Sequence, residues 1–148
     1  MYFVDRTKIE QTLVHMENLL KAVESLKECT STIEQLALER ATHIVIESMM
    51  DVGNAIIDGF IMRDPGSYED ILDIFWDEKV LTESEAASLK QVVSLRKMLV
   101  QQFIDVDHAH LQEVLTKQAS ALSTFSSSVR RYLEKELGPV SAFLPENH

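Results

Sequence analysis

The stretch Leu89–Asp107, LKQVVSLRKMLVQQFIDVD, is the part of the chain around which the rest is organised. Its apolar residues recur at helical spacing and predict one amphipathic helix. They are Leu89, Val92, Val93, Leu99, Val100 and Phe103. Arg96 fills the gap in this apolar stripe. An arginine in that position either reaches out at the edge of the stripe or meets an anionic group there.

Capping signals on both sides of this stretch divide the chain into helices. Asp5 and Ser67 are good N-caps, and Ser31–Glu34 and Thr82–Glu85 fit the capping box. The expected helices cover residues 6 to about 28, 32 to about 62, 68 to about 76, 83 to about 105, and about 108 to 137. No segment alternates with a period of two. We therefore expect an all-α fold, an antiparallel up-down bundle of four long helices plus one short helix. Residues 1–148 form one domain, with 138–148 as a C-terminal tail.

Charge and cysteine content restrict the class of protein. The formal net charge of −10 argues against a general nucleic-acid binder, leaves room for a small basic pocket, and favours a basic protein partner. The single cysteine, Cys29, cannot form an internal disulfide, so a reducing, cytoplasmic setting is expected. We recognise no signal peptide, and no apolar run approaches the ~20 residues of a membrane span.

A polar stripe runs along the second expected helix. Its members are Arg40, His43, Glu47, Asp51, Asn54 and Asp58, spaced so that they share one face. The stripe is either a solvated face or the polar wall of a cleft. His43, Glu47 and Asp51 could also suggest a metal site, but the paired E-x-x-H motifs of di-metal bundles do not occur, and we expect no metal. No G-x-S-x-G and no glycine-rich phosphate loop occurs, so we expect no cofactor.

Several stretches together resemble the HepT-like branch of the HEPN superfamily. They are MYFVDRTKIE, LALERATHIVIESMMDVGNAIIDGF, RDPGSYEDILDIF and SLRKMLVQQFIDVD, which together span almost the whole chain. With the GPVSAF tail, the chain most resembles the YutE subgroup. The resemblance implies a helical homodimer in a toxin–antitoxin setting, with a nucleotidyltransferase of MntA type as the partner antitoxin.

In active members of this family, an R-x4-H pair at the dimer cleft cuts RNA without a metal. The histidine moves a proton and the arginine holds the phosphate. Residues five apart on a straight helix diverge by about 140°, so a shared site or a bent helix would be needed to bring them together.

The chain departs from the family pattern at its decisive position. Arg96 matches the family arginine, but Gln101 stands at the position of the catalytic histidine. Phe103 stands at the tyrosine to which the partner enzyme attaches AMP, and Lys97 replaces an asparagine. Glutamine does not titrate, so a loss of roughly 10²–10⁴-fold from proton transfer is expected.

Two functional hypotheses follow. In the first, the protein is a weakened or inactive HepT-like ribonuclease in which Arg96 binds phosphate, Gln101 hydrogen-bonds to it, and His43 or Glu47 substitutes as proton carrier. In the second, a non-catalytic dimer uses the cleft, including Asp51 and Asn54, to bind a protein or a nucleotide. For Arg96 the alternative to phosphate binding is an ion pair with Asp51 or Glu47.

Overall fold

The computed structural model describes residues 4–26 and 28–138, and these residues form seven helices. The helices are α1 (Arg6–Glu24), α2 (Thr32–Gly59), α3 (Tyr68–Asp77), α4 (Glu83–Val93), α5 (Arg96–Gln101), α6 (His108–Lys117) and α7 (Ala119–Leu137). No strand occurs in these ranges. Apart from Gly138, the expected C-terminal tail consists of residues 139–148, which lie outside the described ranges.

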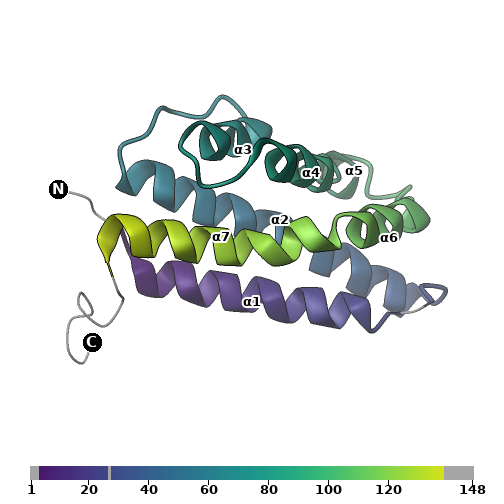
Figure 1. Cartoon of the computed structure of the whole chain (residues 1–148). Helices are drawn as coiled ribbons and strands as arrows, with labels where there is room; N and C mark the ends of the chain where they lie inside the picture. Colours follow the sequence, from purple (N-terminus) through teal and green to yellow (C-terminus); the bar gives the residue numbers. More distant parts are fainter. Residues whose placement is uncertain (1–3, 27, 139–148) are drawn as a thin grey trace.

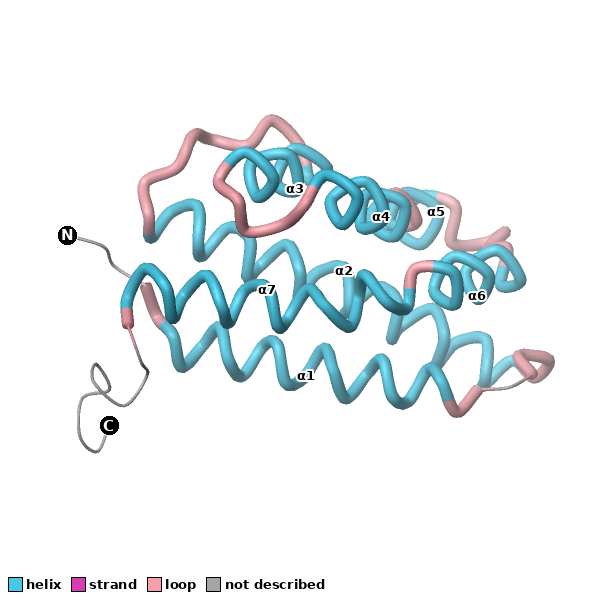
Figure 2. Tube along the Cα trace, viewed as in Figure 1, coloured by secondary structure: helices cyan, strands magenta, loops and turns pink. Residues whose placement is uncertain are grey.

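The all-α antiparallel bundle is confirmed. Figure 1 shows α1 and α2 running antiparallel, α7 alongside α1, and α3 to α5 as an upper row on the other side of α7. The connecting loops gather at the two ends of the bundle, as Figure 2 shows. If α4 with α5, and α6 with α7, are each taken as one rod, then α1, α2 and these two rods are the four passes along the bundle. The short helix α3 packs against α2 and α4.

The expected caps hold the helix starts. The side chains of Asp5 and Ser67 each accept a hydrogen bond from the backbone N–H three residues on. Asp107, which was not singled out above, caps α6 in the same way. Ser31–Glu34 and Thr82–Glu85 both form complete capping boxes, in which side chain and backbone bond reciprocally. These caps satisfy backbone donors that would otherwise lack a partner.

Two of the expected long helices are each divided in two. The expected helix across Leu89–Asp107 is interrupted at Ser94 and Leu95, where the Ser94 hydroxyl donates to the Gln91 carbonyl at 2.7 Å. The Leu95 N–H bonds to the Val92 carbonyl, an i to i+3 contact that tightens the turn. The last expected helix is divided at Gln118, a buried residue whose side-chain amide donates to the side-chain oxygen of Gln91 at 3.0 Å.

The second helix also ends earlier than expected, at Gly59 instead of about Met62. Ile61 has a φ of 55°, in the left-handed region, and the Met62 N–H bonds to the Ile57 carbonyl at 2.9 Å. This pattern closes a Schellman motif, which ends a helix by satisfying its last carbonyls. The helix therefore stops before the Pro65–Gly66 breaker is reached.

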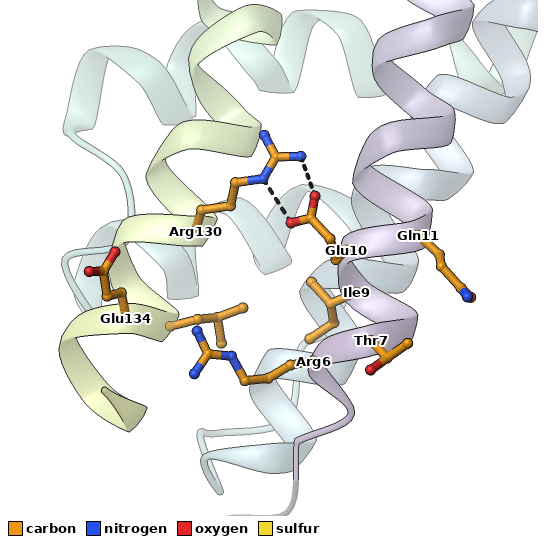
Figure 3. A pocket seen from close by; sticks show the side chains of 8 residues that line it. Arg6, Thr7, Ile9, Glu10, Gln11, Arg130 and Glu134 are labelled. Carbon is orange, nitrogen blue, oxygen red and sulfur yellow. Dashed lines mark hydrogen bonds and ion pairs between the residues drawn. The ribbon is translucent and has the colours of Figure 1, made fainter. Parts of the chain in front are cut away.

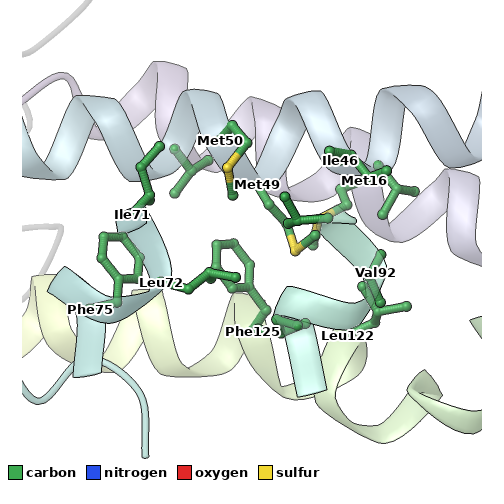
Figure 4. Close-up of a cluster of buried hydrophobic side chains, with 14 of the residues drawn as sticks. Met16, Ile46, Met49, Met50, Ile71, Leu72, Phe75, Val92, Leu122 and Phe125 are labelled. Carbon is green, nitrogen blue, oxygen red and sulfur yellow. The ribbon is translucent and has the colours of Figure 1, made fainter. Parts of the chain in front are cut away.

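One hydrophobic core joins the helices. Side chains from α1, α2, α3, α4 and α7 meet at its centre (Figure 4), among them Met16, Met49, Leu72, Val92 and Phe125. α3 lies so close to α2 that a β-carbon on Gly53 would be 2.4 Å from Cγ2 of Ile71. This close approach places Tyr68, the first residue of α3, near the exposed stripe of α2.

No helix in the described part of the chain is long and apolar enough to cross a membrane.

Candidate functional site

Arg96, the first residue of α5, meets the polar stripe of α2. Its Nε donates to Oε1 of Glu47 at 2.8 Å, and the guanidinium lies over the ring of Tyr68, 4.6 Å from the ring centroid. The hydrogen bond with Glu47 raises the pKa of Arg96, so the guanidinium stays charged. Of the two expected ion-pair partners, the structure selects Glu47 over Asp51.

Glu47 is the centre of this cluster. Its Oε1, which accepts from Arg96, also lies 3.5 Å from Nε2 of His43, one turn earlier on α2. Its Oε2 accepts a long hydrogen bond of 3.5 Å from the Tyr68 hydroxyl. We call these four residues, His43, Glu47, Tyr68 and Arg96, the Arg96 cluster.

The Arg96 cluster lies on an open surface. The side chains of Arg96, Glu47 and His43 are 38%, 33% and 32% exposed. An ion pair this exposed contributes about 0–1 kcal/mol to stability. The pair therefore orients Arg96 more than it stabilises the fold, and an outside ligand can reach all three side chains.

The other predicted site residues lie apart from the cluster. Gln101 is exposed at the last residue of α5, and no hydrogen bond joins it to Arg96. Asp51 and Asn54 are exposed on α2, and their side chains make no hydrogen bond or ion pair with other described residues. Within one chain, then, the arginine and the residue at the histidine position do not converge.

The interruption of the long helix does not bring Arg96 and Gln101 together, because it precedes both residues. They occupy the two ends of the single short helix α5. On a helix they diverge by about 140° and rise about 7.5 Å apart.

Tyr68 is the cluster member that the sequence did not single out. It follows the Pro65-Gly66-Ser67 turn, and Ser67 caps α3 by accepting from the Asp70 N–H. The available signal was weak: an aromatic residue at a helix start, with no spacing that ties it to Arg96. The partnership depends on the close packing of α2 and α3.

Exposed apolar side chains surround the end of α5. Val100, Phe103 and Ile104 are 40%, 66% and 92% exposed. Ile33 and Leu36, in the first turns of α2, are also exposed, and Figure 1 places the start of α2 and the loop after α5 at the same end of the bundle. We call Val100, Phe103 and Ile104 the α5-end patch. Grouped exposed apolar residues of this kind mark interaction surfaces.

A cavity of about 430 Å³ lies elsewhere, between the start of α1 and the end of α7 (Figure 3). Its walls include Ile9 and Leu133, and Arg130 closes one side by binding both Glu10 and Glu17 on α1. A wider recess of about 760 Å³ follows on the other side of this ion-pair network, along α1, α6 and α7. Neither is lined by a predicted site residue.

Among the described residues, no group of three or more His, Cys, Asp or Glu side chains is arranged to hold a metal ion. His43, Glu47 and Asp51 share a face but do not converge on one point.

Helical fold and residue pattern agree with one family. The family model Ribonuclease HepT-like matches residues 9–129, so the chain belongs to the HepT-like family of HEPN proteins. It is 52% identical over 143 residues to the candidate RNase YutE of Bacillus subtilis (strain 168), covering 97% of this chain and 99% of the relative. The solved structure of YutE, a cytosolic protein of unknown function, superposes with a TM-score of 0.92 over 97% of this chain and all of that one.

More distant solved structures share the fold. A tri-AMPylated Shewanella oneidensis HEPN toxin in complex with its MNT antitoxin is 15% identical, with a TM-score of 0.75 over 83% of this chain and 96% of that chain. A toxin–antitoxin structure with AMP-PNP is 16% identical, with a TM-score of 0.71 over 82% of this chain and 96% of that chain. At this level of identity the likeness concerns the fold alone.

Proposed function

We propose that this chain is the HepT-type member of a toxin–antitoxin pair whose RNA-cutting site is degenerate, so that it is weak or inactive as a ribonuclease. One observation carries the proposal. Arg96 is charged, held in place and open to a ligand, while the residue at the histidine position is the non-titrating Gln101.

The chemistry of the two residues separates binding from cleavage. A guanidinium presents five donors in a planar fork that matches a phosphate group. RNA cleavage also needs a group that takes a proton from the attacking hydroxyl and returns one to the leaving oxygen. Gln101 can donate a hydrogen bond to a phosphate oxygen but cannot exchange a proton at neutral pH. The chain therefore retains phosphate binding and loses most of the rate.

A homodimer supplies the second half of the site. Since Arg96 and Gln101 diverge on α5, we place Arg96 of one chain opposite Gln101 of the other. The α5-end patch flanks Gln101 and offers the apolar surface that such a dimer buries. The net charge of −10 fits a protein that takes RNA in a narrow cleft instead of along a broad basic face.

A nucleotidyltransferase of MntA type is the proposed partner, because both of the more distant structures described above contain a toxin with an antitoxin. Phe103 stands where the family's AMP-accepting tyrosine stands and has no hydroxyl. AMP transfer at this position is therefore impossible, and control by the partner would act through binding.

A second candidate function is a non-catalytic dimer that binds a protein or nucleotide ligand in the same cleft. It is favoured by the α5-end patch, in which Ile104 is 92% exposed. Both candidates place the protein in the cytoplasm, with no metal and no cofactor.

Two assays on one protein preparation distinguish the two candidate functions. Partners are first captured from the source cell, and the same protein is then incubated with single-stranded RNA, with and without Arg96→Ala. The degenerate-nuclease proposal expects slow cleavage that Arg96→Ala removes, together with capture of a nucleotidyltransferase. RNA that stays intact at every protein concentration, with no nucleotidyltransferase among the captured partners, supports the binding protein. Fast cleavage by the unchanged protein, lost in Arg96→Ala, contradicts both.

A further inference from the structure

One carboxylate oxygen in the Arg96 cluster lies close to nitrogen atoms of two side chains. Oε1 of Glu47 lies 2.8 Å from Nε of Arg96 and 3.5 Å from Nε2 of His43. A guanidinium and an imidazole that converge on one oxygen form a small anion site. In this structure the anion at that point belongs to the protein itself.

The guanidinium of Arg96 retains donors for another ligand. Its fork carries five N–H groups, and the bond to Glu47 uses the one on Nε. No described residue accepts a hydrogen bond from Nη1 or Nη2, and the side chain is 38% exposed. The Tyr68 ring beneath the guanidinium fixes the plane in which those donors lie.

The geometry points to Glu47 as an internal competitor for a phosphate group at an anion site formed by Arg96 and His43. A phosphate oxygen in the place of Oε1 would contact both side chains, and the remaining oxygens would meet the free edge of the fork. This inference rests on the proposed phosphate-binding role of Arg96. It adds His43 as the second side chain of the site and assigns Glu47 the role of weakening phosphate binding.

The pair that a phosphate must displace is weak. Glu47 is 33% exposed on α2, so its carboxylate can turn outward into water. If it stays in place instead, its negative charge opposes the incoming phosphate. In both cases, removing the charge while keeping the side-chain shape should strengthen phosphate binding.

The size of the effect follows from Coulomb's law. Two unit charges about 6 Å apart, at effective dielectric constants between about 80 and 20, change a binding constant by roughly 3-fold to 100-fold. Glu47→Gln keeps an oxygen for the Arg96 Nε–H and removes the charge. We therefore expect Glu47→Gln to lower the dissociation constant for phosphate by roughly 3-fold to 100-fold relative to the unchanged protein.

A matched control is available on the same helix. Glu39 of α2 also pairs with a histidine, since its Oε2 lies 2.7 Å from Nε2 of His108. Glu39→Gln removes the same charge from the protein but lies outside the Arg96 cluster. An effect of net charge alone would be the same in both variants.

The test is a titration of the ¹⁵N-labelled full chain with inorganic phosphate, and separately with a short single-stranded RNA, at about 0.1 M salt. The signals followed are Arg96 Nε–H and the backbone amides of α5. We expect tighter binding in Glu47→Gln, unchanged binding in Glu39→Gln, weaker binding in His43→Gln, and little binding in Arg96→Lys, which keeps the charge but loses the fork. Circular dichroism confirms that each variant is folded.

The outcomes separate the two proposals. If Arg96→Lys loses binding but Glu47→Gln binds no more tightly than the parent, the competitor role is wrong and the phosphate-binding arginine stands. If Arg96→Lys binds as the parent does, the proposed function fails as well. If the variants show the expected order of affinities for RNA but not for inorganic phosphate, the ligand is the RNA backbone. If they show it for inorganic phosphate but not for RNA, the ligand is free phosphate. If neither ligand gives the order, the inference is overturned.

Discussion

Gly53 gives a stability prediction whose size can be worked from the structure. It is buried in α2, and a β-carbon there would lie 2.4 Å from Cγ2 of Ile71 on α3. Carbon atoms in contact lie about 3.5–4.0 Å apart. Gly53→Ala therefore forces α2 and α3 apart by about 1 Å, or drives the Ile71 side chain out of its preferred rotamer.

Two opposing effects set the net change. Overpacking of a core costs about 1–3 kcal/mol, and Ile71 is β-branched and buried, so it yields little. Replacing glycine by alanine inside a helix contributes about 1 kcal/mol in the other direction. With a displacement of about 1 Å, we expect Gly53→Ala to lower the free energy of unfolding by up to about 2 kcal/mol.

A double-mutant cycle with Ile71→Ala isolates the clash. Alanine removes Cγ2 and leaves only Cβ of residue 71, which is 3.8 Å from the added methyl group, an ordinary contact. In that background Gly53→Ala should stabilise the protein by up to about 1 kcal/mol. The assay is urea unfolding followed by circular dichroism at one fixed protein concentration, since a dimer's stability depends on concentration. Stabilisation by Gly53→Ala in the parent protein would refute the close packing of α2 on α3.

Three further predictions concern other parts of the molecule. Ile61 is a β-branched residue at φ 55° and is 78% exposed, so Ile61→Gly should raise the free energy of unfolding by about 1 kcal/mol in urea; a loss would contradict the strained turn. Hydrogen bonds from Arg63 and from the Gly66 N–H lower the pKa of Asp70 to about 2. The stability that the charged Asp70 contributes is fully present above the unfolded-state pKa of the carboxyl group and is lost as pH falls toward the folded-state pKa. The free energies of unfolding of the parent and of Asp70→Asn should therefore differ at pH 5 and converge near pH 2. A difference that persists at pH 2 would point to another cause. Light scattering at micromolar concentration should show the proposed dimer in the parent protein and a monomer in Ile104→Glu. Ile61→Glu changes an equally apolar exposed site away from the α5-end patch and serves as the control. A parent protein that is already a monomer would overturn the two-chain site.

The helix starts were predictable because each depends on a local signal. The Ser31–Glu34 and Thr82–Glu85 boxes are complete within four residues, and the structure has both. The divisions at Ser94 and Gln118 were not predicted, since no glycine or proline marks them. They depend on a serine hydroxyl that bonds back to the Gln91 carbonyl and on a buried glutamine held by the Gln91 side chain, a partner from elsewhere in the chain.

The candidate site was predicted in part, because contacts within one helix follow from the sequence and contacts between helices do not. Residues on one helix face are related by spacing, so His43 and Glu47 could be paired from the sequence. The contact of Arg96 with Glu47 was one of two possibilities, and choosing between them requires the packing of α5 on α2. Tyr68 was missed because only the close approach of α3 to α2, made possible by Gly53, brings its ring under the guanidinium.

The central claim is that this HepT-like chain holds a phosphate-binding arginine but lacks the group that moves the proton. Its most direct test is RNA cleavage by the unchanged protein, by Gln101→His, and by Gln102→His, which places the same imidazole one residue further along the exposed end of α5. We expect little cleavage by the unchanged protein and by Gln102→His, and a gain of roughly 10²-fold or more in Gln101→His. Robust cleavage by the unchanged protein, abolished by Arg96→Ala and not increased by Gln101→His, would contradict the claim.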